Sequence, residues 1–363
     1  MKTQVSNSSL DIARCFATDG KATESVPLGN GLINDTYLVT TDSGERYVLQ
    51  RINRAVFQDV DTLQQNLKLI TAHIRKSLAR KGIDDLDRKV LTPVDASDGS
   101  LWVEDLDGNA WRMTKFIADS VTRSELTPEM AKVTGKAFAD FHAFFAEQDA
   151  PVLQETIPDF HNTAFRIKQL RDAVTGNRVN RLEDCRKEVE YLLDRSEEML
   201  EAQRQADNGT LPRRTAHCDT KLNNILFDEN GEVLCVIDLD TTMPGFVLSD
   251  FGDFIRTAAN TGKEDDPALD RVSVNMDIFR NFAEGYVKNA SFLTQVERSL
   301  LPFGAKMLTY MQAVRFLTDY INGDTYYKVE YPEHNLVRTR TQIKLLQSID
   351  SNYDEMNRFI SAL

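Results

Sequence analysis

Residues 217–240 read HCDTKLNNILFDENGEVLCVIDLD, and polar side chains flank two short apolar runs in this stretch. The runs are separated by Asn230-Gly231, the dipeptide that two-residue type I′ turns prefer, so the stretch predicts a β-hairpin. Two explanations account for the many oxygen-bearing side chains at the ends of the hairpin. They form either a metal site that holds a polyphosphate or a solvated acidic turn.

The spacing of these polar residues suits phosphoryl transfer. Asp219 stands where a loop carboxylate can accept the proton of an attacking hydroxyl group. Asn224 and Asp238 would be brought together by the hairpin, and their side-chain oxygens are ligands that Mg²⁺ prefers. Lys221 can neutralise charge on the transferred phosphate, whereas His217 is expected to hydrogen-bond the loop backbone. Short acidic patterns recur by chance, so this pattern gains weight from the elements that precede it.

A second acidic stretch, SDFGDFIR, follows at residues 249–256. It contains the letters D-F-G, but Asp238 already fills the metal-binding position, so this stretch is not expected to bind the metal. Asp250 is instead predicted to anchor the loop that carries Asp219, by accepting hydrogen bonds from backbone N–H groups. For Asp253, an acidic residue at a helix start is an equally good explanation. Cys218 is expected to pack and has no predicted role.

Length, charge and cysteine usage bound the class of protein. The chain has 363 residues, more than one hydrophobic core usually supports, which predicts two lobes or domains. Its formal net charge of −13 repels nucleic acid and anionic membrane surfaces, so neither is an expected partner. An anionic ligand would then need a local positive pocket or a metal ion. The four cysteines form no C-x-x-C pair, which argues against a disulfide framework or a thiolate zinc site.

The N-terminal sequence MKTQVSNSSLDIARCF lacks the apolar core of a signal peptide. No apolar run approaches the ~20 residues that a membrane-spanning helix needs. We therefore expect a cytoplasmic protein, a monomer or a small homo-oligomer, that acts on a small molecule.

The first third of the chain alternates between strands and a helix. Residues 36–53 predict a hairpin around Asp42-Ser43-Gly44, and residues 100–117 predict a second strand pair around an Asp-Gly-Asn turn. Between them, residues 61–82 have apolar positions at spacings of three and four, which predict a helix that ends at Gly82. Such a pattern is typical of an antiparallel sheet with one packed helix.

Helical patterns dominate from about residue 119. Thr127-Pro128-Glu129 has the hydroxyl, the proline and the acid of a helix start, and residues 186–205 predict an amphipathic helix. The predicted fold class is α+β with two lobes. A small antiparallel β-sheet lobe with one helix covers residues 1–118, a hinge lies near residues 116–120, and a larger, mainly helical lobe with an embedded hairpin covers residues 119–363.

Residues 27–37, PLGNGLINDTY, are glycine-rich and directly precede a strand. Gly29 and Gly31 would let backbone N–H groups approach a phosphate closely because neither has a Cβ, although Gly-Asn-Gly is also a routine turn. The loop does not match the Walker motif. In the next strand, Arg51 either points back at the phosphates or lines a solvated face of the sheet.

The order of these elements resembles the aminoglycoside phosphotransferase and choline kinase superfamily, which has the protein-kinase-like fold. The resemblance is carried by PLGNGLIN, YVLQRIN, HCDTKLNNILF, VIDLDTTMPG and SDFGD and covers nearly the whole chain. Within the superfamily, the long segment KVEYPEHNLVRTRTQIKL at residues 328–345 is most similar to the N-acetylhexosamine 1-kinases. The resemblance implies transfer of the ATP γ-phosphoryl group to the anomeric hydroxyl of N-acetylglucosamine or N-acetylgalactosamine.

The resemblance also implies roles for particular residues. Asp219 would be the catalytic base, with Lys221 beside it, and Asn224 and Asp238 would be the magnesium ligands. Asp240 is a further candidate at the metal, either for a second ion or as a group that supports a ligand. The remaining positions are the nucleotide loop and the hinge backbone that would meet adenine, namely Gly29, Gly31, Asn34, Arg51, Lys115, Phe116 and Ile117.

The acceptor site is predicted in residues 314–327, VRFLTDYINGDTYY. Arg315, Asp319, Asp324 and Tyr327 would supply the hydrogen bonds and the apolar wall that a sugar needs. Arg315 and Asp319 are four residues apart, so a surface salt bridge on a helix is the alternative.

Three departures from the superfamily stand in the sequence. Gln50 and Arg51 lie where many kinases of this fold have lysine, and Asn66 and Lys68 lie where a glutamate that pairs with this lysine is expected. Leu32 occupies the position where the N-acetylhexosamine kinases are expected to have histidine.

Two other functions remain open on the sequence alone. One is a kinase of the same fold for another alcohol, such as an aminoglycoside, choline or a different sugar, and the acidity of the chain suits a cationic acceptor. The other is a non-catalytic nucleotide-binding module, whose mark would be a lost base or metal ligand.

Overall fold

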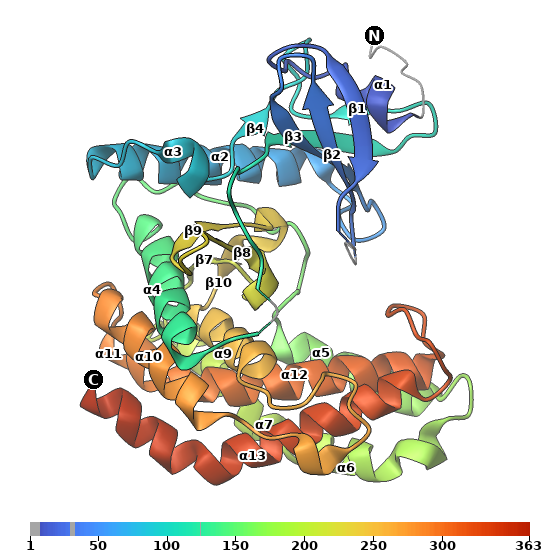
Figure 1. Cartoon of the computed structure of the whole chain (residues 1–363). Coiled ribbons are helices and arrows are strands. Elements are labelled where there is room, and N and C mark those ends of the chain that lie inside the picture. The colour runs from blue at the N-terminus through green and yellow to red at the C-terminus, as the bar shows by residue number, and fades with distance from the viewer. Residues whose placement is uncertain (1–7, 30–32, 124) are drawn as a thin grey trace. The chain divides into compact units, whose positions relative to one another are not determined.

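The structure is a computed structural model that describes residues 8–29, 33–123 and 125–363, and its contacts divide the chain into two compact units (Figure 1). We call the first the β-rich unit; it comprises the described residues up to Val121, Glu147–Pro158 and Ile225–Met243. We call the second the helical unit; it comprises the described residues of Thr122–Ala146, Asp159–Asn224 and Pro244–Leu363. Each unit therefore draws on three separate parts of the sequence.

An antiparallel sheet forms the centre of the β-rich unit. Its strand order is β1-β2-β3-β6-β4, and β5 also pairs with β6. The strands are β1 (Ala22–Pro27), β2 (Asp35–Thr41), β3 (Arg46–Ile52), β4 (Pro93–Val94), β5 (Val103–Glu104) and β6 (Ala110–Lys115). The pairing of β2 with β3 and of β5 with β6 confirms both hairpins predicted in this part of the chain.

The predicted long helix is α2 (Val60–Arg80). The Asp59 side chain caps its N-terminus by accepting a hydrogen bond from Thr62 N at 3.0 Å. Gly82, at φ +73°, follows its C-terminal end as expected, because a residue with a Cβ is strained there. Two shorter helices complete this part, α1 (Ser9–Ala13) and α3 (Leu86–Lys89).

A cluster of charged residues ties the segment 147–158 to α2. His73, Glu147 and Asp149 lie close enough for their side chains to converge on a cation. However, Arg80 pairs with Glu147 and Lys76 pairs with Asp149, each at 2.6 Å. Since both carboxylates already have cationic partners, we interpret the cluster as an attachment of this segment to the helix.

The hairpin predicted at residues 217–240 is formed by β8 (Ile225–Phe227) and β9 (Val233–Val236). Its loop is longer than predicted, and the prediction of a type I′ turn is wrong. Such a turn needs positive φ at both central residues, whereas Gly231 has positive φ and Asn230 does not. The Asp228 carboxylate shapes the loop instead, by accepting hydrogen bonds from the N–H groups of Asn230 and Glu232, each at 2.9 Å.

The hairpin groups with the β-rich unit, whereas the sequence placed it within the helical lobe. The reason is apolar packing, since Leu234 and Cys235 form a buried cluster with Ile117. The 3₁₀-helix η3 (Leu239–Thr241) follows β9, and β10 (Met243–Gly245) begins at the last residue of the unit.

In the helical unit, α4 packs against α10, and α12 packs against α5, α9 and α13 (Figure 1). The main helices are α4 (Pro128–Phe144), α5 (Thr163–Gly176), α9 (Val247–Ala258), α10 (Met276–Asn289), α12 (Leu301–Asn322) and α13 (His334–Ala362). The short elements are α11 (Gln295–Ser299), β7 (Arg214–Ala216), η1 (Leu182–Cys185), η2 (Leu222–Asn224) and η4 (Leu269–Arg271). None of the described helices is both long and apolar enough to cross a membrane.

The helix start predicted at residue 127 is confirmed, because Thr127 accepts a hydrogen bond from Met130 N and Pro128 is the first residue of α4. The single helix predicted over residues 186–205 is wrong. That segment forms three short helices, α6 (Arg186–Asp194), α7 (Ser196–Met199) and α8 (Glu201–Asp207). It contains neither glycine nor proline, so the sequence offered no local signal for the breaks.

Glycines set the closest helix contacts of the helical unit. A Cβ at Gly135 of α4 would lie 2.2 Å from the carbonyl oxygen of Phe282 in α10. A Cβ at Gly252 of α9 would lie 2.1 Å from the carbonyl oxygen of Gly304 in α12. Both crossings bring backbone against backbone, so they exclude any side chain at these positions.

We predict that Gly135→Ala lowers the free energy of unfolding by about 3 kcal/mol, because α4 and α10 must move apart. Gly176→Ala is the matched control, since a Cβ there meets nothing closer than 3.9 Å and alanine favours the helix by a few tenths of a kcal/mol. Urea unfolding followed by circular dichroism measures both variants. Equal midpoints for the two variants would contradict the close contact.

Candidate active site

The loop that carries Asp219 follows β7 and ends in η2, and Asp250 of α9 holds it from within the helical unit. The Asp250 carboxylate accepts hydrogen bonds from His217 N at 2.6 Å and Cys218 N at 2.8 Å. Cys218 has φ +64°, a conformation that non-glycine residues rarely adopt and that needs support from neighbours. The predicted anchoring of the loop by Asp250 is therefore confirmed.

Asp250 is itself oriented by a buried chain of polar groups. His142 Nε2 lies 2.8 Å from the carboxylate, and the other ring nitrogen of His142 lies 2.8 Å from the hydroxyl of Tyr286. Burial alone would raise the pKa of Asp250. The hydrogen bond and charge of His142 and the hydrogen bond from His217 N together act more strongly in the opposite direction, so the pKa of Asp250 is lowered. The anchor is thus ionised and accepts every hydrogen bond offered to it.

Asp253 supports the same loop one helical turn further along. It accepts a hydrogen bond from Thr220 N at 3.0 Å and pairs with Arg256 at 2.9 Å. It lies in the middle of α9, so the interpretation as an acidic residue at a helix start is wrong. The Thr220 hydroxyl adds a bond of 2.6 Å to the backbone oxygen of Asp250.

The predicted base Asp219 lies between two predicted partners of the helical unit. Its carboxylate is 2.7 Å from Lys221 Nζ and accepts a hydrogen bond from Asn224 Nδ2 at 3.1 Å. Asn224 Nδ2 also donates to the backbone oxygen of Asp219 at 2.7 Å. The amide nitrogen of Asn224 is thereby turned toward Asp219, and its amide oxygen takes no part in these bonds. That arrangement fits a ligand for an oxygen-preferring cation such as Mg²⁺.

Lys221 keeps its positive charge beside the predicted base. Desolvation lowers the pKa of Lys221, but the charge of Asp219 and the hydrogen bond to it act more strongly, and the net shift is upward. Asp219 therefore has a permanent cation next to it, as a residue that handles phosphate charge would require.

In the β-rich unit, Asp238 is the N-cap residue directly before η3, with φ +58°, and Asp240 lies within η3. The Asp240 carboxylate is buried and forms a two-pronged ion pair with Arg112 of β6, in which Nη2 and Oδ2 lie 2.8 Å apart. Asn34 Nδ2 donates to the same carboxylate at 3.0 Å. Both oxygens of Asp240 are thus already engaged, and Arg112 is a residue that the sequence analysis missed.

The sequence carries no local signal for this role of Arg112. Arg112 shares a strand face with Ala110 and Thr114, whereas the apolar Trp111 and Met113 lie on the other face, so alternation predicts that Arg112 is solvated. In the structure both faces of β6 are buried.

The predicted nucleotide loop is described only in part. Gly29 has φ +68°, which explains the glycine, whereas Gly31 and Leu32 lie outside the described residues. Asn34 Oδ1 accepts a hydrogen bond from Asn53 N at 3.0 Å, so this side chain ties the loop to the residue that follows β3. Arg51 forms an exposed ion pair with Asp35 across β2 and β3, with Nε at 2.7 Å, as the solvated alternative expected.

The predicted hinge backbone is partly used within the β-rich unit. Lys115 N donates to Thr92 O at 2.8 Å and Phe116 N donates to Arg46 O at 3.0 Å. The backbone N–H of Ile117 takes part in neither bond, so it is the better candidate of the three for a contact with adenine.

In the helical unit, Asp319 shapes the loop that carries Tyr327. Its carboxylate accepts hydrogen bonds from the backbone N–H groups of Thr325, Tyr326 and Tyr327 at 2.9–3.0 Å. The predicted alternative of an ion pair between Arg315 and Asp319 is therefore wrong.

Asp324, in the same loop, pairs with Arg181, and Asn335 Nδ2 donates to it at 2.8 Å. Asp319 and Asp324, the two acidic residues predicted to bind the acceptor, thus stabilise the conformation of this loop. We expect their role to be the positioning of the loop.

Arg315 lies among aromatic rings instead. Its guanidinium carbon is 5.2 Å from the ring centroid of Phe160, 5.7 Å from that of Tyr326 and 5.6 Å from that of Tyr327. Phe160 also stacks on His161, with centroids 4.7 Å apart. We call these five residues the Arg315 cluster. Phe160 and His161 were missed because they come from an irregular segment with no periodic pattern.

Charges of both signs act on this cluster, those of Arg166 and of the carboxylates Asp159, Asp250 and Asp253. Burial lowers the pKa of His161 to about 4, although Asp253 and Asp250 oppose the shift. Burial and the nearby charge of Arg315 lower the pKa of Arg166 to about 10. His161 Nδ1 and Arg166 Nε are buried and lack a hydrogen-bond partner among the described residues. Such atoms are suited to a polar ligand that the chain itself does not supply.

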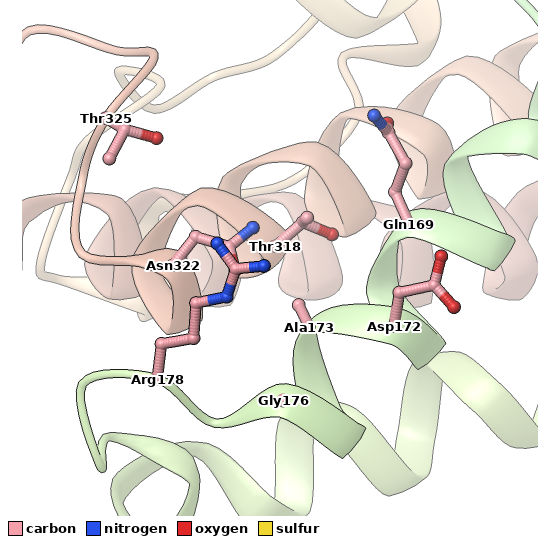
Figure 2. Close-up of a pocket in the computed structure, with 8 residues that line it drawn as sticks. All are labelled: Gln169, Asp172, Ala173, Gly176, Arg178, Thr318, Asn322 and Thr325. Carbon is pink, nitrogen blue, oxygen red and sulfur yellow. The ribbon is translucent and has the colours of Figure 1, made fainter.

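A separate hollow of about 350 Å³ lies between α5 and α12. Figure 2 shows Gln169 and Asp172 projecting from α5 and Thr318 and Asn322 from α12, with Arg178 on the connection after α5. None of the predicted site residues lines this hollow, so it is distinct from the candidate active site.

The family model of the phosphotransferase enzyme family, APH, matches residues 24–284, and the chain belongs to this family. Its fold is also similar to those of several solved structures. They include an aminoglycoside phosphotransferase from Alicyclobacillus acidocaldarius (TM-score 0.55, 12% identity, 94% of this chain and 93% of that one). Another is an amicoumacin kinase in complex with AMP-PNP and Ca²⁺ (TM-score 0.55, 14% identity, 89% of this chain and 88% of that one). A third is a choline kinase from Cryptosporidium parvum (TM-score 0.52, 15% identity, 92% of this chain and 90% of that one). These similarities confirm the predicted α+β, kinase-like fold class.

The low pKa of His161 predicts a pH-dependent stability. A histidine whose pKa falls from 6.5 to about 4 on folding contributes stability above pH 6.5 that is lost as the pH falls toward 4. Between pH 7 and pH 5, the free energy of unfolding of the wild type should therefore fall by about 1–2 kcal/mol more than that of His161→Gln. Urea unfolding at both pH values measures this difference, and parallel losses in the two proteins would contradict a neutral, buried His161.

Proposed function

We propose that this protein is an ATP- and Mg²⁺-dependent kinase that phosphorylates the anomeric hydroxyl of N-acetylhexosamines. Membership of the phosphotransferase enzyme family supports the reaction class. Nucleotide use is supported by the fold relatives, since the amicoumacin kinase was solved with AMP-PNP and a spectinomycin phosphotransferase with ADP. The choice of a sugar rests on the Arg315 cluster and on the resemblance of residues 328–345.

Asp219 is the proposed base. Its carboxylate takes the proton of the acceptor hydroxyl as the hydroxyl oxygen bonds to the γ-phosphorus, and the bond between this phosphorus and the bridging oxygen of ADP breaks. Asp250 and Asp253 hold the loop backbone around the base, so the carboxylate is positioned before the substrate arrives. Lys221 offsets negative charge on the transferred group.

Asn224 and Asp238 are the proposed holders of the magnesium ion, which supplies neutralisation of the phosphate charge when bound. The amide of Asn224 is oriented for this role by its bonds to Asp219. Asp240 is proposed to support the ligand segment rather than to bind the ion, because its carboxylate is already engaged by Arg112 and Asn34.

The observation that carries the choice of acceptor is the charge of the Arg315 cluster. Arg315 and Arg166 are cationic, His161 is neutral at pH 7, and Asp319 and Asp324 are engaged in the loop. A neutral, oxygen-rich sugar can use guanidinium donors and an aromatic wall. A quaternary ammonium or aminoglycoside would be repelled by the two arginines.

A kinase for a cationic alcohol is the second candidate. The net charge of −13 favours it, because a negative surface attracts cationic ligands over long range. Local charge at the acceptor outweighs this effect in our proposal, since buried groups are screened less than surface groups.

The first prediction of the proposal concerns substrate choice. Release of ADP from Mg-ATP should depend on N-acetylglucosamine or N-acetylgalactosamine and should give an acid-labile sugar 1-phosphate. Choline, an aminoglycoside and plain hexoses should give lower kcat/KM values. A response to choline or the aminoglycoside alone would overturn the substrate and keep the reaction class.

Asp219→Asn is the control for this assay. It should lower kcat at least ~10³-fold because the proton acceptor is lost, while AMP-PNP binding changes little. Retention of more than a small fraction of activity would show that Asp219 is not the base.

Arg315→Gln should raise the KM for the sugar at least ~10-fold, because hydrogen bonds to a charged donor are lost. Its KM for ATP should stay within about twofold, since the change affects ground-state binding of the acceptor. Arg186→Gln serves as the matched control, because Arg186 is an exposed arginine of the same unit that pairs with Glu183. Steady-state kinetics separates the two constants, and an unchanged sugar KM would remove Arg315 from the acceptor site.

A further inference from the structure

The β-rich unit contains a buried arginine that the reaction scheme above does not use. Arg112 projects from β6 and forms its two-pronged ion pair with Asp240, and the side chains of both residues are at most 5% exposed. The third side of the guanidinium is also engaged, since Nε donates to Gln50 Oε1 at 3.0 Å. Gln50 lies directly opposite Arg112 in the register of β3 and β6. Every edge of this cation is thus used within the unit.

Asp240 is in turn the meeting point of several segments. Its carboxylate accepts hydrogen bonds from Arg112 and from Asn34, which belongs to the glycine-rich loop. Its backbone oxygen accepts a hydrogen bond from Thr156 at 2.8 Å. Asn34 also accepts a hydrogen bond from Asn53 N. One buried carboxylate therefore connects the sheet, the glycine-rich loop, the hairpin and the segment 147–158.

The predicted metal ligand Asp238 lies two residues before this junction. Its φ of +58° is a left-handed conformation, which a non-glycine residue keeps only where its surroundings hold it. Asp238 is the N-cap residue of η3, and Asp240 lies within η3. The bonds to the side chain and to the backbone oxygen of Asp240 therefore hold the turn that follows Asp238. Arg112 supplies the charge that keeps Asp240 buried in that position.

We propose that Arg112 is a positioning residue for divalent-metal binding: through Asp240, it holds the turn that presents Asp238 and ties that turn to the glycine-rich loop. The inference rests on the proposed function. Loss of Arg112 releases the turn that presents Asp238, whereas the glycine-rich loop keeps the bond from Asn53 N to Asn34. Metal affinity in the nucleotide complex therefore falls, while affinity for the nucleotide alone changes little. Arg112 does not touch the metal or the reacting atoms.

Mn²⁺ binding in the presence of AMP-PNP tests this role without catalysis. Free Mn²⁺ is measured by electron paramagnetic resonance, and AMP-PNP binding without metal is measured by calorimetry. Arg112→Lys keeps the charge but loses the two-pronged geometry, and it should weaken Mn²⁺ binding at least ~10-fold, with metal-free AMP-PNP binding within about threefold. Arg54→Lys is the matched control, because Arg54 is an exposed arginine of the same unit that pairs with Glu104.

The double variant Arg112→Met/Asp240→Leu separates positioning from folding. Replacing both charges with apolar side chains removes the unpaired buried charge, so the melting temperature should return toward wild type. The Mn²⁺ affinity should not return, because the bond to Asn34 and the hold on the turn are lost. Recovery of both would overturn the proposal, and so would wild-type Mn²⁺ affinity in folded Arg112→Lys.

Failure of the proposed function gives a different result. In that case wild type itself would show no Mn²⁺ binding that depends on AMP-PNP, whereas failure of the inference leaves wild-type binding intact and affects only the comparison with the variants.

Discussion

Two backbone N–H groups and one imidazole converge on the carboxylate of Asp250 inside the helical unit. The loop that carries Asp219 depends on this interaction, because Cys218 is held in a left-handed conformation next to the predicted base. A buried, ionised carboxylate is costly unless its hydrogen bonds are satisfied, and here the loop backbone satisfies them. Helix α9 can present Asp250 at that depth because Gly252 lets it approach α12 backbone to backbone.

The same device recurs elsewhere in the chain. Asp253 holds Thr220 N, Asp319 holds three successive N–H groups, and Asp228 closes the hairpin loop. Of these three residues, only Asp319 was predicted to bind a ligand, and in the structure its carboxylate holds irregular backbone as the other two do. Because Asp319 and Asp324 are engaged in their own loop, Arg315 is the one charged side chain among the five residues of the Arg315 cluster, and on this ground we propose a neutral acceptor.

Local signals in the sequence predicted much of the fold. The hairpins around residues 42–44 and 228–232, the helix that ends before Gly82 and the cap at Thr127 follow from neighbours within a few residues. The anchoring role of Asp250 was also predictable, because the loop beside the proposed base needs a fixed acceptor for its backbone N–H groups.

The sequence by itself determined the order of strands and helices and the positions of Asp219, Asn224 and Asp238, because periodicity, capping and spacing act over short distances. Only the tertiary structure decided which charges are paired. Arg112 meets Asp240 across 128 residues, and Phe160 reaches Arg315 from an irregular segment. Such pairs depend on burial, since a charge that leaves water must find its partner wherever the packed chain places it, and no local pattern records that distance.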